Sequence, residues 1–201
     1  MGNGVEALAR EVAEKVDRIR SLLAESSENE FVATFGAGVE LDSAAILDEY
    51  CRTMDFSIEQ GWVSSGNRAE WPALVVPEAL TALYRITNAA TAGYVGLFDK
   101  FCKGDIMDPD GEVHRSEEHW LQVGLIGNDQ FSVSLMSGEV MFADQYFWRY
   151  GEQDSSRIVA PDMLTFFDEY MIGPKYREFL VDDEAERPGS WFRFLLDYGF
   201  A

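Results

Sequence analysis

Residues 120–143 read WLQVGLIGNDQFSVSLMSGEVMFA, and this stretch decides the fold. It contains three short runs that are apolar or alternate between apolar and polar residues, at 120–126, 130–136 and 139–143. Asn128-Asp129 separates the first two runs and Ser137-Gly138 separates the last two. Because two-residue connections of these types join antiparallel strands, the stretch predicts a three-stranded meander.

The middle run indicates how the side chains of the meander are oriented. Phe131, Val133 and Leu135 alternate with Ser132 and Ser134. Successive side chains of a strand point to opposite faces of the sheet. We therefore expect the three apolar residues to lie in the core beside the first helix, and the two serines to face the other side.

Helices are expected on both sides of the meander, where apolar residues recur at three or four positions. This spacing predicts helices over 5–23, 43–54, 77–90, 161–171, 176–180 and 191–198. Asp42 is a candidate cap for the second helix. A strand is expected over 92–98, and a loop over 57–71. With no internal repeat or linker, residues 1–201 predict a single α+β domain with a mainly antiparallel central sheet flanked by helices.

The composition describes a strongly acidic chain that is long enough to bury a sizeable core. Its 201 residues include 36 Asp and Glu against 16 Lys and Arg, which gives a net charge of −20. Nucleic-acid binding needs a basic surface, so direct binding to DNA or RNA is disfavoured. The charge favours a basic protein partner or none.

Targeting and redox features favour the cytoplasm. The first 20 residues carry four acids, and no run of 18 apolar residues occurs, so neither an export signal nor a membrane anchor is expected. Cys51 and Cys102 are too few for a disulfide framework and fit a reducing compartment.

No catalytic or metal-binding motif emerges. His114 and His119 are five residues apart, so on a helix their rings would diverge and could not share one ion. Gly36-Ala37-Gly38 lacks the third glycine of a dinucleotide turn, since Leu41 stands there. Distant carboxylate pairs for glycoside chemistry remain an open alternative. We expect a protein that is not an enzyme and that uses neither cofactor nor metal.

The acidic segment between Lys103 and His119 is expected to be an exposed loop that receives a basic partner. A calcium loop starting at Asp108 would need Gly and Glu where the chain has Val113 and His119, so at most weak calcium binding remains as an alternative. The acids proposed for partner binding are Asp105, Asp108, Asp110, Glu112, Glu117 and Glu118.

A second candidate surface is the aromatic cluster from Phe142 to Tyr150. Its default interpretation is core packing, and its alternative is an exposed patch that binds a partner. Trp148 and Tyr150 are set among charged residues, so they join the predicted partner-binding set.

Three pieces of the chain, in order, resemble the SUKH superfamily, which is named partly for yeast cell-wall regulators of the Smi and Knr type. They are PEALTALYRITN at 77–88, WLQVGLIGND at 120–129 with the strands after it, and VAPDMLTFF at 159–167. The family often has Gly after the Asn of the first piece, where this chain has Ala89. The resemblance does not account for segments 31–76 and 181–201.

The resemblance implies a non-catalytic, protein-binding domain of unassigned oligomeric state. Bacterial members are mostly inferred to be immunity proteins that neutralise a toxin, often a nuclease, by binding it. Nuclease toxins tend to be basic, and complementary charge speeds encounter between proteins. The alternative is an intracellular regulatory scaffold or signalling adaptor of the Smi/Knr type.

Overall fold

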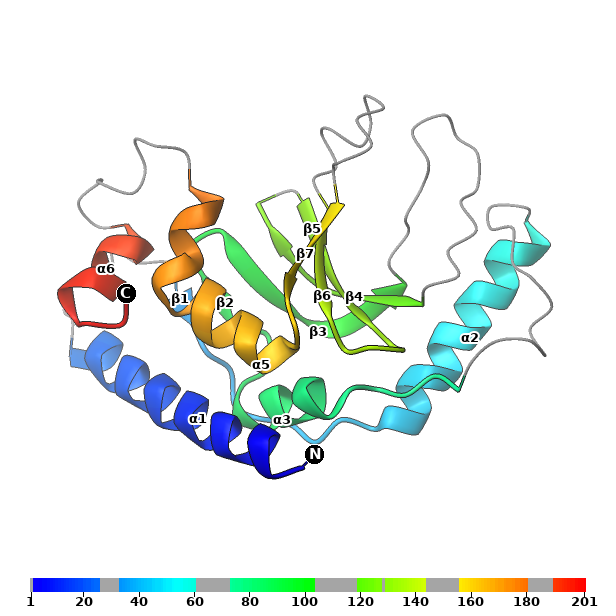
Figure 1. Cartoon of the computed structure of the whole chain (residues 1–201), viewed down its shortest axis with the longest axis horizontal. Coiled ribbons are helices and arrows are strands. Elements are labelled where there is room, and N and C mark those ends of the chain that lie inside the picture. The colour runs from blue at the N-terminus through cyan, green and yellow to red at the C-terminus, as the bar shows by residue number, and fades with distance from the viewer. Residues whose placement is uncertain are drawn as a thin grey trace.

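The computed structural model describes residues 2–25, 33–60, 73–103, 119–127, 129–143, 156–180 and 190–201. Within them, seven strands form one antiparallel sheet whose spatial order follows the chain from β1 to β7 (Figure 1). The strands are β1 (Ala33–Thr34), β2 (Thr91–Ala92), β3 (Val95–Lys103), β4 (Trp120–Ile126), β5 (Asp129–Ser134), β6 (Val140–Ala143) and β7 (Ser156–Ala160). The predicted α+β architecture with a mainly antiparallel sheet is confirmed.

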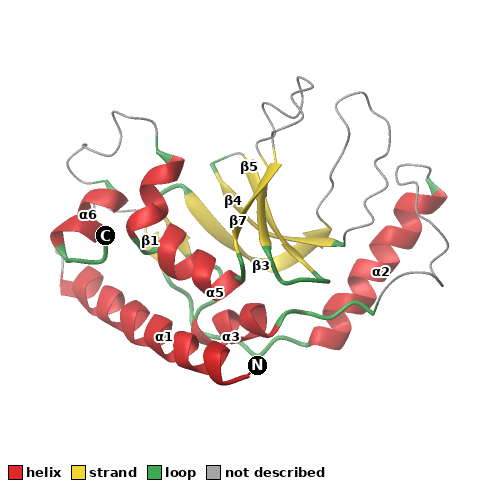
Figure 2. Cartoon of the chain, viewed as in Figure 1, coloured by secondary structure: helices red, strands yellow, loops and turns green. Residues whose placement is uncertain are grey.

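Helices surround this sheet, and Figure 2 shows them in red along its lower and outer sides. The α-helices are α1 (Gly2–Glu25), α2 (Ser43–Glu59), α3 (Glu78–Ile86), α5 (Met163–Phe166) and α6 (Trp191–Asp197). A π-helical turn, η2 (Phe167–Met171), continues α5, and a 3-10 helix, η3 (Pro174–Phe179), follows it. Along the long axis of the molecule, α2 and α6 lie at opposite ends (Figure 1).

The ends of the helices follow from capping residues. The Ala45 amide donates to Asp42 Oδ1 at 3.0 Å, so Asp42 caps α2 as predicted. This helix continues to Glu59, and the expected loop over 57–71 is therefore wrong for its first residues. In α3, Pro77 is the N-cap and the helix ends at Ile86, four residues before the expected end.

The predicted meander is present, with one turn displaced. Asp129 belongs to β5 and pairs with Ile126, so the connection between β4 and β5 starts at Gly127 rather than at Asn128. Gly127 has a φ of 62°, a left-handed conformation that glycine adopts without steric cost. The connection between β5 and β6 follows Ser134, and Gly138 within it has a φ of 83°.

The middle strand is buried on both faces, including the face that carries its serines. Phe131, Val133 and Leu135 are in the core as predicted, but Ser132 and Ser134 are also buried, at 1% and 3% exposure. The hydroxyl of Ser134 accepts from two amides of the following turn, at 3.0 and 3.1 Å. A small hydroxyl that closes a turn can be buried at little cost because its polar atom is satisfied.

The helix over Phe131 is α5 and not α1, which corrects the expectation that Phe131 packs beside the first helix. The ring centroids of Phe131 and Phe166 are 4.7 Å apart. Helix α1 packs on α3 and α5 and so lies one layer farther from the sheet. Its Lys15 donates to the Asp168 carbonyl at 3.1 Å and to the Asp168 carboxylate at 2.8 Å, which fixes α1 to the π-helical turn.

One expected strand and one expected helix differ in their bounds from the prediction. The strand expected over 92–98 is divided into β2 and β3, which pair across a turn at Gly93, where φ is 59°. The helix expected over 161–171 begins at Met163, because Asp162 caps it, and ends in the π-helical turn. Of the described helices, none has both the length and the apolar content needed to cross a bilayer.

Candidate functional site

The residues predicted to bind a partner lie outside the described part of the chain. This applies to the six acids between Asp105 and Glu118 and to Trp148 and Tyr150. The described residues nearest to the acidic segment are Lys103, at the end of β3, and His119, just before β4. Both predicted sets therefore remain predictions.

His119, just before β4, is buried. It is 3% exposed, and its Nδ1 lies 3.3 Å from the hydroxyl of Tyr50 in α2, which is 4% exposed. The two rings meet edge to face, with centroids 5.9 Å apart. The Leu135 amide donates to the His119 carbonyl at 2.8 Å. His119 thus connects α2 to the start of β4 and to the end of the middle strand.

Burial keeps both members of this pair neutral. Desolvation lowers the pKa of His119. Desolvation, with a smaller effect from the Cys51 thiol, raises the pKa of Tyr50 well above its usual value. Two neutral groups in a hydrogen bond hold α2 against the sheet without a buried charge. Because both side chains are shielded from solvent, we assign the pair a positioning role for α2.

Helix α2 presents acids and one aromatic ring to solvent. Its buried residues are Tyr50 and Met54, and its outward positions follow at three- or four-residue spacing. Arg52 forms ion pairs with Asp48 and Glu49, with N–O distances of 2.6 Å in each. Phe56, one turn farther along, is 51% exposed.

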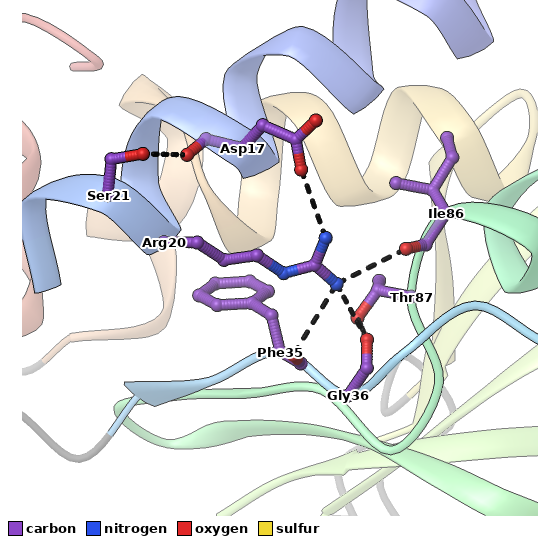
Figure 3. A network of polar contacts seen from close by, with 7 residues as sticks. All are labelled: Asp17, Arg20, Ser21, Phe35, Gly36, Ile86 and Thr87. Carbon is purple, nitrogen blue, oxygen red and sulfur yellow. Dashed lines mark hydrogen bonds and ion pairs between the residues drawn. The ribbon is translucent and has the colours of Figure 1, made fainter. Parts of the chain in front are cut away.

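A polar cluster where α1 meets the end of α3 is structural (Figure 3). The Arg20 guanidinium donates to the carbonyls of Gly36 at 2.6 Å, Ile86 at 3.3 Å and Phe35 at 3.4 Å, and it pairs with Asp17 at 3.1 Å. It therefore joins α1, the segment after β1 and the carboxyl end of α3. Since its acceptors are mostly backbone carbonyls that need donors, this arginine supports the fold rather than a ligand.

The glycines at 36 and 38 have a packing role that the sequence did not reveal. A Cβ atom on Gly38 would lie 1.8 Å from the Arg85 carbonyl oxygen, and one on Gly36 would lie 2.2 Å from the Asn88 carbonyl oxygen. Close approach of two backbones requires glycine at both places. The Val39 amide then donates to the Tyr84 carbonyl at 2.7 Å.

An ion pair continues this contact at the surface. The Arg85 guanidinium holds the Glu40 carboxylate through both oxygens, with a shortest distance of 2.6 Å. The hydrogen bond from Arg85 lowers the pKa of Glu40. Both groups are solvent-exposed, so this pair fixes local geometry more than it stabilises the fold.

A groove of about 310 Å³ lies between α1 and α3. Its floor is apolar, and its rim carries two acids and two arginines. The lining residues are Val5, Glu6, Ala9, Arg10, Glu78, Ala82, Arg85 and Ile86. The balanced rim charge does not select a ligand of either sign.

Metal ligands are not grouped in the described ranges. Among these residues, no three His, Cys, Asp or Glu side chains are placed to hold one ion. Cys51 is a half-buried free thiol on α2.

Searches for similar proteins returned nothing that places the chain in a family: no family model, no curated protein and no solved structure matches it.

Proposed function

We propose that this protein is a non-catalytic, cytoplasmic binding protein that neutralises a basic toxin by forming a stoichiometric complex with it. A nuclease is the toxin class that best fits the charge, since nucleases that act on phosphate backbones are commonly basic. By occupying the toxin's surface, this protein would protect the cell that makes the toxin, or a neighbouring cell.

The observation that carries this proposal is the excess of acids and its exposure. Part of the net charge of −20 is carried by acids at exposed positions of α1 and α2, such as Glu11, Glu14 and Glu59. A field of one sign attracts an oppositely charged protein and accelerates association. It also repels nucleic acid, so the chain would not compete for the substrate of a nuclease.

The resemblance to the SUKH superfamily supports the same role. The first stretch that resembles the family, 77–88, forms α3, whose N-cap is Pro77. The second stretch, 120–129, forms β4 and leads into β5. Family members of bacterial origin are mostly inferred to act as immunity proteins, and this chain is proposed to act in the same way.

The test is titration of the protein encoded by the adjacent reading frame. That protein should be toxic when expressed alone, and growth should return when the present chain is co-expressed. In vitro, its activity should fall linearly and reach zero at one molar equivalent of this chain. Inactivation by a small fraction of an equivalent would indicate turnover and refute stoichiometric binding.

A regulatory scaffold of the Smi/Knr type is the second candidate, and the groove between α1 and α3 favours it. A scaffold needs a surface to which a second protein can bind, and this groove between two helices, with its apolar floor, is such a surface. Under this alternative, the adjacent protein would form a complex with the chain without losing activity.

A further inference from the structure

The two edges of the sheet differ in how their backbone groups are used. At one edge, β1 has only two residues, and the Gly36 carbonyl after it accepts from Arg20 at 2.6 Å and from Thr87 at 3.1 Å. At the other edge, β7 has five residues and pairs with β6 on one side. Among the contacts of the described residues, no hydrogen bond outside this pairing reaches the backbone of Ser156–Ala160. Alternate amide and carbonyl groups of β7 therefore point away from the sheet and are available to another strand.

The side chains in the middle of β7 show that solvent reaches this edge from both faces of the sheet. Arg157 and Ile158 follow one another, so their side chains point to opposite faces. The Arg157 side chain is 54% exposed and Ile158 is 51% exposed. The Arg157 guanidinium lies 3.8 Å from the Glu178 carboxylate of η3, and this exposed pair leaves the backbone of β7 uncovered.

Ile158 gives this edge an apolar side chain where edge strands commonly carry charge. It is one of four large apolar residues that are more than half exposed in the described ranges. Val159, the next residue, is a bulge, because Ala160 pairs with Val140 while Ile158 pairs with Met141. A bulge bends its strand and interrupts regular pairing, so the part open to a new strand is Ser156–Ile158. We call these three residues the β7 edge.

The chemistry of the β7 edge selects its occupant. A row of backbone donors and acceptors binds an extended polypeptide, whose own backbone offers the matching groups. A second copy of this chain is disfavoured, because each copy carries a net charge of −20 and the two would repel one another. A strand of three residues also buries far less than the roughly 800 Å² per copy of a stable dimer. A different protein with positive net charge is attracted instead and can add contacts beyond the edge.

We propose that the β7 edge docks an extended segment of a basic partner protein, which adds a strand to the sheet and places an apolar side chain against Ile158. Backbone hydrogen bonds hold the segment, and the contact with Ile158 selects its register. The inference rests on the proposed function, because it names the surface through which that function would act.

The first experiment observes the backbone of the β7 edge directly. Amide hydrogen exchange is followed residue by residue by NMR, in the free chain and in its complex with the protein encoded by the adjacent reading frame. The outward-facing amides of the β7 edge should exchange at least about tenfold more slowly in the complex, since they gain acceptors. Ala33 and Thr34, at the opposite edge of the sheet, are the control and should keep their exchange rates within about twofold.

The second experiment changes the apolar side chain. Ile158→Lys is compared with Met136→Lys, because both residues are 51% exposed and both changes add one positive charge, so any general loss of attraction is common to the two. Met136 lies in the connection between β5 and β6, away from the β7 edge. Ile158→Lys should raise Kd about tenfold more than Met136→Lys does, because its charge would have to be buried against an apolar side chain. Far-UV circular dichroism would verify that both variants are folded.

The outcomes distinguish the two proposals. If the complex forms and the outward-facing amides of the β7 edge exchange as fast as in the free chain, docking at this edge is refuted while the proposed function stands. If Ile158→Lys and Met136→Lys weaken binding equally, Ile158 does not contact the partner and the inference is again refuted. If the parent chain forms no complex, the proposed function falls, and this inference falls with it.

Discussion

Replacing Phe131 with alanine tests the core on which the architecture depends. Its side chain is 0% exposed, stacks on Phe166 and lies above Gly124, where an added Cβ would come within 2.2 Å of the ring. Removing a fully buried phenyl ring costs about 3–5 kcal/mol. Because packed backbone and a second ring bound the site, it cannot collapse, and we expect a loss of about 4–5 kcal/mol in the free energy of unfolding.

The measurement is equilibrium unfolding in urea, followed by tryptophan fluorescence and by far-UV circular dichroism. For a chain of this length the loss corresponds to a fall in Tm of about 8–20 °C. Phe131→Leu keeps part of the volume and should fall between parent and alanine variant, which preserves the test if the alanine variant does not fold. The matched control is Phe56→Ala, which should cost less than about 1 kcal/mol because half of that ring is exposed. A loss below about 1 kcal/mol for Phe131→Ala would refute the core placement of the middle strand.

Four further outcomes are expected. Gly38→Ala should cost about 2 kcal/mol or more in urea unfolding, since its Cβ would meet the Arg85 carbonyl at 1.8 Å, whereas Gly4→Ala, with open space around it, should be neutral or stabilising. Arg20→Lys should cost about 1–3 kcal/mol in the same assay, because an ammonium group cannot reach three carbonyls in the fixed geometry of a guanidinium. Burial lowers the pKa of His119, so below about pH 6.5 the unfolded chain binds a proton that the folded chain does not. The free energy of unfolding should therefore fall as the pH drops from about 6.5 towards the pKa of the folded state. His119→Gln should make the free energy of unfolding depend less steeply on pH in this range. Excess chelator should leave the Tm unchanged, and a fall of many degrees would reveal a metal site.

The sequence predicted those elements that depend on interactions between residues close together in the chain, such as helix caps and turns. Helix α1 follows from apolar spacing, and the start of α2 follows from Asp42, because an N-cap needs only its own first turn. The meander follows from alternation and turn residues. Its first connection starts one position earlier than expected, at Gly127, which has a left-handed φ of 62°.

Features that depend on distant partners could not be predicted from the sequence. His119 is buried because Tyr50, 69 residues earlier, covers it, and no local pattern carries that information. Ser132 and Ser134 alternate correctly with the apolar residues, yet alternation indicates only that two faces differ and not whether the second face is also covered. Gly36 and Gly38 were tested as a nucleotide-binding turn, whereas their role is close contact with the end of α3.

The candidate site was only partly accessible to sequence reasoning. Net charge indicated a basic partner, and acid density directed attention to the segment after Lys103. The helix expected over 43–54 stopped short of Phe56, so that residue was assigned to no helical face. Its exposure becomes meaningful only once α2 is seen to continue to Glu59, with Tyr50 and Met54 turned inward.

The distribution of buried contacts makes the exposed side of α2 suitable for mutation without unfolding the protein. Helix α1 places Val12, Val16 and Ile19 in the core and packs on two other helices, whereas α2 buries two residues and packs chiefly on β3. Changes on the outward side of α2 remove solvent-exposed atoms, and the helix keeps its inward contacts. Substituting Tyr50 would instead change the position of α2, because that buried side chain contacts His119.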